Sequence, residues 1–202
     1  MSERYVVFTG RPNAGKSSLI RALTGLKPPV GKRPGTTTSI KRYPLAPGLT
    51  LVDMPGYGSR ARGSKKWEDR AKDSILGFLK ENADSIVAAV HVVNIPTFLE
   101  AEERLARKGY LSLDVEMVGY IRDTLGELPL VAANKIDKGS EDEVVANLEA
   151  FISRMPGGEQ GSGQLVFPVS AKTGDGVGAL KGRLLEVLRR AGFRDPFEYL
   201  RS

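Results

Sequence analysis

Short apolar runs that alternate with stretches of helical spacing constrain the fold of this chain more than any other feature. Five such runs lie at residues 4–9, 49–52, 86–93, 130–133 and 165–169. Runs this apolar are typical of strands buried on both faces, and the alternation with helices is typical of a parallel sheet. We therefore expect an α/β fold in three layers, with a mostly parallel sheet of about six strands and helices on both faces.

The length of 202 residues and the 41% hydrophobic content fit one globular domain. No internal repeat is evident, and the glycine-rich stretch at 156–163 is too short to separate domains. We predict a single domain over residues 1–202, with a core at about 4–191 and a C-terminal extension at about 192–202. We expect the polar, aromatic tail from residue 193 onward to lie on the surface.

Composition also narrows the class of protein. The chain has no cysteine, no run of 18 apolar residues and no signal-peptide pattern in MSERYVVFTG, so we expect a cytoplasmic protein without a membrane partner. A formal net charge of +6 favours acidic partners such as RNA, although composition alone identifies none. Ligands of such sheets bind beyond the carboxyl ends of the strands, so the loops there are the places to look for chemistry.

The first of these loops, residues 10–17, reads GRPNAGKS and matches the phosphate-loop pattern G-x-x-x-x-G-K-[ST]. It lies between a predicted strand and a predicted helix, as that motif requires. Backbone N–H groups at the helix N-terminus would face phosphates, Lys16 would supply a positive charge, and the Ser17 hydroxyl could bind Mg²⁺.

Two further segments could complete a phosphate and magnesium site. Asp53 ends the run 49–52 in the sequence D-M-P-G, where its carboxylate could hold a Mg²⁺-bound water and the Gly56 N–H could reach a γ-phosphate. In the loop 31–38, the hydroxyl of Thr37 could complete the Mg²⁺ ligands. Thr36 and Thr38, the two adjacent residues, are alternative candidates for this Mg²⁺ ligand.

A purine-reading group follows the run 130–133, in the sequence N-K-I-D. The carboxylate of Asp137 can accept two charge-assisted hydrogen bonds from guanine N1 and N2, and adenine offers no such pair of donors. Lys135 can lay its aliphatic stem on the base. The tripeptide S-A-K at 170–172 would offer backbone N–H groups to guanine O6.

These five elements occur in the order of a GTPase G domain, and the sequence resembles the EngB-type GTPases of the TrmE–Era–EngA–EngB–septin group. The resemblance rests on residues 10–18, 34–37, 53–58, 114–117 and 170–176, of which DMPGYG at 53–58 is the most specific. It implies a Mg²⁺-dependent GTPase in the cytoplasm that assists assembly of the large ribosomal subunit. The implied catalytic residues are Lys16, Thr37 and Gly56, and the implied Mg²⁺ ligands are Ser17, Thr37 and Asp53.

The same resemblance implies a wider set of nucleotide-binding residues along the chain. They are Gly10, Arg11, Pro12, Asn13, Ala14, Gly15, Lys16, Ser17, Ser18, Gly35, Thr36, Thr37, Asp53, Met54, Pro55, Gly56, Asn134, Lys135, Asp137, Ser170, Ala171 and Lys172.

The sequence departs from the bacterial members of this group in three places. It has N-K-I-D at 134–137 where they usually have T-K-x-D, and three threonines at 36–38 where they have Arg-Thr-Gln. The segment 97–113 is longer than theirs and looks more like the archaeal branch, which we take as the nearest.

Two residues bear on the rate of hydrolysis. Tyr57 stands directly after D-x-x-G, where Ras-like GTPases have the glutamine that orients the attacking water, so we expect slow intrinsic turnover. Tyr57 either takes part in orienting this water or merely packs in a mobile loop. Asn13 corresponds to an asparagine that binds K⁺ in resembling families, and the alternative is that asparagine suits the turn.

Three other features have a structural and a functional interpretation. His91 lies in the apolar run 86–93, and we predict a hydrogen-bonded core histidine without a catalytic role. Trp67 lies in the basic segment 60–72 and either anchors a helix to the core or stacks on RNA. The basic segment itself is either a solvated surface or an RNA contact.

We expect GTP, GDP and the large ribosomal subunit or its rRNA as partners of a monomer, and no DNA. Two alternatives remain open at this point. The chain could be a nucleotide-dependent binding module with negligible hydrolysis, or a GTPase of cell division or tRNA modification.

Overall fold

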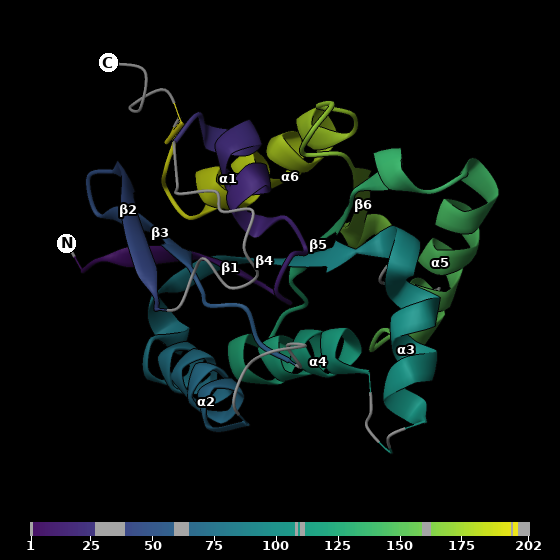
Figure 1. Ribbon diagram of the computed structural model, residues 1–202. Coiled ribbons are helices and arrows are strands. Elements are labelled where there is room, and N and C mark those ends of the chain that lie inside the picture. Colours follow the sequence, from purple (N-terminus) through teal and green to yellow (C-terminus); the bar gives the residue numbers. More distant parts are fainter. Residues whose placement is uncertain are drawn as a thin grey trace.

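The computed structural model describes residues 2–26, 39–58, 65–107, 109, 112–158, 163–194, 196 and 197, with backbone alone for 65–70. Six strands form one sheet in the order β2-β3-β1-β4-β5-β6 (Figure 1). Their bounds are β1 Arg4–Gly10, β2 Lys41–Ala46, β3 Leu49–Asp53, β4 Ile86–Asn94, β5 Leu130–Asn134 and β6 Val166–Val169. The pair β2 and β3 is antiparallel, and the other neighbours are parallel.

Helices cover both faces of this sheet. Figure 1 shows α1 and α6 on one face and α2 and α4 on the other, with α3 and α5 near β5. The helices are α1 Lys16–Thr24, α2 Lys65–Glu81, α3 Phe98–Ala106, α4 Leu113–Leu125, α5 Glu141–Arg154 and α6 Val177–Arg190. The predicted three-layer α/β fold with a mostly parallel sheet is confirmed.

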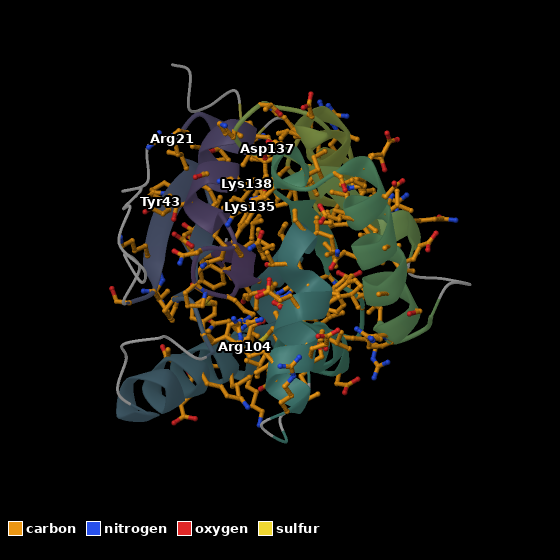
Figure 2. The ribbon with its side chains drawn as sticks, turned by 45° about the vertical axis from the view of Figure 1, so that its right-hand side comes forward. Arg21, Tyr43, Arg104, Lys135, Asp137 and Lys138 are labelled. Atoms are coloured by element: carbon orange, nitrogen blue, oxygen red, sulfur yellow. The ribbon has the colours of Figure 1, made fainter. Side chains whose placement is uncertain are left out.

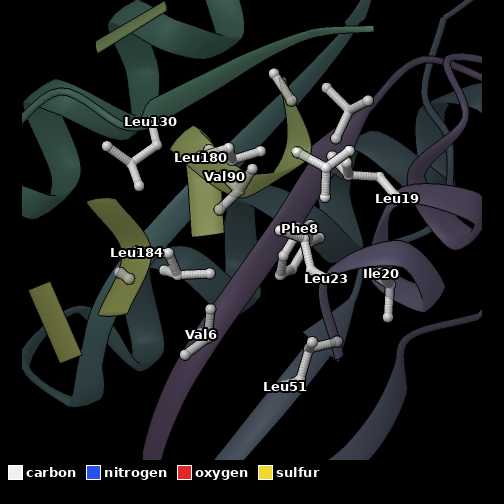
Figure 3. Packing of buried hydrophobic residues seen from close by; sticks show 14 of the residues in the cluster. Val6, Phe8, Leu19, Ile20, Leu23, Leu51, Val90, Leu130, Leu180 and Leu184 are labelled. Atoms are coloured by element: carbon white, nitrogen blue, oxygen red, sulfur yellow. The ribbon is translucent and has the colours of Figure 1, made fainter. Parts of the chain in front are cut away.

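The alternation of side chains along β4 explains why the sheet needs both layers. Val90 and Val92 pack in one buried cluster with residues of α1 and α6, and Ala89 packs in another with residues of α2 and α4. Figure 3 shows the first cluster, in which Leu19 and Leu23 of α1 and Leu180 and Leu184 of α6 surround the strands. Six successive residues of β4, from Ala88 to Val93, are buried, because successive side chains point to opposite faces and each face is covered by helices.

Local signals fix where two helices begin. Ser112 precedes α4, and its side chain accepts a hydrogen bond of 3.3 Å from the Val115 N–H. Ser140 and Glu143 form a reciprocal capping box at the start of α5. Each cap satisfies N–H groups that have no partner within the first helical turn.

Three outcomes differ from the sequence analysis or lie outside the described residues. The last strand begins at Val166 rather than at residue 165, because Gly163–Leu165 form a 3-10 turn. The tail is not wholly on the surface: Phe197 is 4% exposed in the cluster of α1 and α6, with Lys181 Nζ 5.4 Å from its ring centroid. A large apolar ring gains more from burial there than from contact with water. The threonine-rich loop at 31–38 lies outside the described residues.

Candidate active site at the carboxyl edge of the sheet

Four of the five predicted motifs follow strands that point the same way, so the fold brings these four to one edge of the sheet. The phosphate loop joins β1 to α1, Asp53 ends β3, Asn134 ends β5, and Ser170 follows β6. Asn13 has a positive φ of 64°, a left-handed conformation that asparagine tolerates better than most residues. The turn therefore accounts for an asparagine at this position, and its K⁺ role stays a prediction.

Asn134 connects the phosphate loop to the S-A-K segment. Its side-chain Nδ2 donates to the Ala14 carbonyl at 2.9 Å, and its Oδ1 accepts from the Ala171 N–H at 3.0 Å. The residue is 1% exposed, so both hydrogen bonds are shielded from water. One buried amide thereby fixes the distance between two loops that are far apart in sequence.

The carboxylate of Asp137 is held in place from the same side. The Ser170 hydroxyl donates to its Oδ1 at 2.7 Å, and Lys172 Nζ lies 3.9 Å from its Oδ2. The side chain is only 13% exposed, although the residue as a whole is exposed. The carboxylate is thus oriented by the protein before any base is present.

Lys135 lies between these groups and the phosphate loop. Its Cε is 3.9 Å from the position that a Cβ on Gly15 would occupy, so its stem lies against the loop. Burial lowers the pKa of Lys135, and the nearby Lys138 lowers it further. Figure 2 shows Lys135, Asp137 and Lys138 close together and Arg104 well away from them.

The end of the candidate site at the phosphate loop contains a buried lysine and a pair of side chains with oxygen atoms. Lys16 is 7% exposed, and burial lowers its pKa although the carboxylate of Asp53 acts in the opposite direction. The Ser17 hydroxyl donates to Asp53 Oδ2 at 3.3 Å, and Asp53 is fully buried. A hydroxyl and a carboxylate side by side are the donors that Mg²⁺ prefers, so the residues present fit this ion.

The D-x-x-G segment packs directly on the phosphate loop. A Cβ on Gly56 would lie 2.9 Å from the Pro12 nitrogen and 3.0 Å from its Cα, which leaves no space for a larger residue. The next residue, Tyr57, is 2% exposed and its hydroxyl donates to the Leu113 carbonyl at 3.4 Å. Tyr57 therefore packs, as one of its two interpretations predicted, and it does so within a buried core cluster.

His91 is a hydrogen-bonded core residue, as predicted. It is fully buried, and its ring nitrogens contact Thr9 and Asp114. The contacts of Asp114 were not predicted, because residues 114–117 entered the sequence analysis only as one of the segments that carry the resemblance. The available signal was Ser112, a residue type common at the N-cap, which places Asp114 in the first turn of a helix. The contact of Asp114 with His91 depends on tertiary packing.

Several predicted site residues have no described surroundings. Gly35, Thr36, Thr37 and Thr38 lie outside the described residues, as do the side chains of Lys65, Lys66, Trp67 and Arg70. Among the helices that the structure describes, none is both long and apolar enough to cross a lipid bilayer.

Comparison with known proteins agrees with this geometry. The model of a family described as 50S ribosome-binding GTPase matches residues 5–135. A probable GTP-binding protein EngB from Methanopyrus kandleri is 39% identical over 202 residues, which cover 98% of each chain. Its counterpart from Archaeoglobus fulgidus is 32% identical over 201 residues, which cover 100% of each chain. These relatives are archaeal, which confirms the predicted branch.

A solved structure gives the same answer in three dimensions. The crystal structure of a probable GTP-binding protein engB is 35% identical, has a TM-score of 0.80, and covers 92% of this chain and 99% of its own. The chain therefore belongs to the EngB family of GTP-binding proteins, a family of GTPases.

Proposed function

We propose that this chain is a Mg²⁺-dependent GTPase switch whose GTP form binds the large ribosomal subunit, or its rRNA, during assembly and whose hydrolysis releases it. The observation that carries this proposal is the match of residues 5–135 to a family described as 50S ribosome-binding GTPase. In this proposal the chain acts as one G domain, as a monomer in the cytoplasm, and needs no DNA.

The base is recognised by the end of the site near β5 and β6. Asp137 accepts the N1 and N2 hydrogens of guanine, Lys135 covers one face of the base, and the backbone N–H of Ala171 serves O6. The contacts of Asp137 with Ser170 and Lys172 support this role, because they orient the carboxylate in advance.

The phosphates and the metal occupy the other end. Lys16 neutralises the β- and γ-phosphates, and Ser17 and Asp53 hold Mg²⁺, with Thr37 as a further ligand. The ion supplies charge neutralisation to the phosphates. In a Ser17→Ala variant, half-maximal GTP hydrolysis should require about tenfold more Mg²⁺; an unchanged requirement would remove Ser17 from the ligand set.

Slow intrinsic hydrolysis follows from the place of Tyr57. Its hydroxyl is engaged with the Leu113 carbonyl and its ring lies in the core, so it does not orient a water molecule at a γ-phosphate. Ras-like GTPases orient the attacking water with a glutamine at this position. A GTPase without it needs other groups to speed hydrolysis, and we propose the ribosomal particle as the activator.

The basic segment after D-x-x-G is the proposed contact with the ribosome. Lys65, Lys66 and Arg70 belong to the start of α2, which follows the D-x-x-G segment in the chain, and in switch GTPases this part of the chain changes order with the γ-phosphate. Each phosphate contact made by such residues makes binding more sensitive to salt.

Co-sedimentation with purified ribosomal subunits in a non-hydrolysable GTP analogue or in GDP tests the proposal. We expect binding to the large subunit in the analogue and at least tenfold weaker binding in GDP. Equal sedimentation in both nucleotides, or none, would contradict the proposed function.

Two charge-reversal variants test where on the protein the contact with the ribosome lies. Changing Lys65, Lys66 and Arg70 to glutamate should weaken binding and flatten its salt dependence, with GTP affinity almost unchanged. Changing Arg183, Arg189 and Arg190 on α6 to glutamate alters the net charge equally and is the matched control. Equal losses in the two variants would indicate that net charge alone acts.

A further inference from the structure

A chain of buried polar contacts lies beside the phosphate loop and is not explained by nucleotide binding. His91 on β4 is fully buried, with its Nδ1 2.9 Å from Thr9 Oγ1 and its Nε2 3.2 Å from Asp114 Oδ1. Because a carboxylate can only accept, Nε2 carries a proton; in the neutral ring the Thr9 hydroxyl then donates to Nδ1.

The second oxygen of Asp114 faces the phosphate loop itself. Its Oδ2 lies 3.7 Å from Nη1 of Arg11, the second residue of the loop, and the two side chains are 5% and 17% exposed. Ion pairs this shielded from water are screened less by salt than surface pairs. Asp114 therefore connects the core histidine with the loop that cradles the phosphates.

The D-x-x-G segment reaches the same helical turn. The Tyr57 hydroxyl donates to the carbonyl of Leu113, the first residue of α4, and the Tyr57 ring centroid is 6.3 Å from that of His91. A Cβ on Gly58 would lie 2.8 Å from Leu113 Cδ1 and 3.6 Å from Arg11 Nε. The segment after Gly56 thus lies between the phosphate loop and the start of α4.

Two loops that must be aligned for hydrolysis are consequently fixed to one structural element. We propose that Asp114 is a positioning residue for GTP hydrolysis: through Arg11 and His91 it holds the first turn of α4, and with it Tyr57, against the phosphate loop. A misplacement of about 1 Å in such a site can cost roughly a hundredfold in rate. The base-reading residues lie elsewhere, so this role concerns hydrolysis and leaves guanine recognition alone.

The Asp114→Asn variant isolates the charge of this group. An amide of the same size can still accept from His91, but it loses the ion pair with Arg11. We expect single-turnover GTP hydrolysis to fall about tenfold, with GDP affinity within about twofold of wild type. Asp123→Asn is the matched control, because it makes the same change on an exposed part of the same helix and should keep the wild-type rate.

A double-mutant cycle tests whether Arg11 and Asp114 act together. If they do, Arg11→Met combined with Asp114→Asn should hydrolyse GTP no more slowly than the slower single variant. The proposal would be overturned if the rate losses of the two single variants multiplied in the double variant, or if Asp114→Asn kept the wild-type rate. A loss of GDP affinity equal to the loss of rate would also overturn it.

A milder variant covers the case in which Asp114→Asn does not fold. Tyr57→Phe keeps the buried ring and removes only the hydroxyl that meets the Leu113 carbonyl, and we expect a severalfold slower hydrolysis with unchanged GDP affinity. An unchanged rate would contradict the role of the first turn of α4. All these measurements use the purified chain and GTP, so failure of ribosome binding leaves them unaffected.

Discussion

The two ends of the proposed nucleotide site are built in different ways. At the base-reading end, hydrogen bonds within the protein orient the polar side chains: Asn134 bonds to two backbone groups, and Asp137 accepts a hydrogen bond from Ser170. At the phosphate end, burial lowers the pKa of Lys16, and the Ser17 hydroxyl meets Asp53 at a longer 3.3 Å. The first end is oriented by the protein alone, and the second holds a desolvated charge that a bound phosphate would stabilise.

This difference has a consequence for binding. If guanine binds at the proposed base-reading end, this preorganised group of side chains would lose little entropy and would supply specificity at low cost. A buried ammonium group gains the full benefit of an anionic partner only when the phosphates arrive. We therefore expect the largest effects of mutation at the phosphate end and the sharpest changes of specificity at the base end.

Removal of the buried cation should have the largest effect. In Lys16→Ala the phosphates lose a shielded charge partner worth about 4 kcal/mol, so GTP affinity should fall roughly a thousandfold. Titration calorimetry measures this loss, with Lys80→Ala on the exposed side of α2 as the control. An affinity within tenfold of wild type would mean that the phosphate end does not depend on Lys16.

Replacement of the base-reading carboxylate should change specificity. Asp137→Asn removes two charge-assisted hydrogen bonds to guanine, about 3 kcal/mol, so GTP affinity should fall roughly a hundredfold. Xanthosine triphosphate should bind better to the variant than to wild type, because its extra carbonyl accepts from an amide. Equal GTP affinity in both proteins would remove Asp137 from base recognition.

The lowered pKa of Lys16 predicts a dependence of GTP binding on pH. In the free protein Lys16 loses its proton below the ordinary value of 10.5, and bound phosphates restore the protonated form. GTP binding should therefore take up a proton at pH values between the lowered pKa and 10.5. Over this range GTP affinity should fall as pH rises, by up to about tenfold per pH unit.

The same shift fixes the sign for stability. Between the lowered folded pKa and 10.5 the unfolded chain binds more protons, so this lysine makes the free protein more stable as pH rises. In Lys16→Arg the side chain stays protonated, so the pH dependence of GTP binding that remains in this variant belongs to the nucleotide. Identical pH profiles for wild type and Lys16→Arg would contradict the prediction.

The smallest expected effect concerns potassium at the phosphate loop. We expect GTP hydrolysis to be severalfold faster in K⁺ than in Na⁺ at equal ionic strength, because a cation at Asn13 would stabilise the transition-state charge. Asn13→Ala should erase the difference, and so should Asn13→Gly, which removes the amide without straining a backbone at φ 64°. Equal rates in the two salts would show that Asn13 serves the turn alone.

Much of the fold was predictable because buried strands leave a strong local signal. The predicted runs at 4–9, 49–52, 86–93 and 130–133 agree with β1, β3, β4 and β5 to within one residue at their ends. The antiparallel strand β2 had no such signal, since its sequence KRYPLA begins with two basic residues, contains a proline and has only one buried residue. Nor did local pattern indicate that Phe197 folds back onto α6, because this depends on a surface formed by distant helices.

The sequence by itself determined the motifs, their order and their places after strands, and from these the GTPase family followed. These features are local: a glycine-rich turn, a capped helix and an apolar strand are each specified by a few adjacent residues. Only the tertiary structure decided that Asn134 joins the phosphate loop to Ala171, and that Asp114 lies between His91 and Arg11. Such contacts join residues up to 120 positions apart, so they exist only once the packed sheet has brought the ends of its strands together.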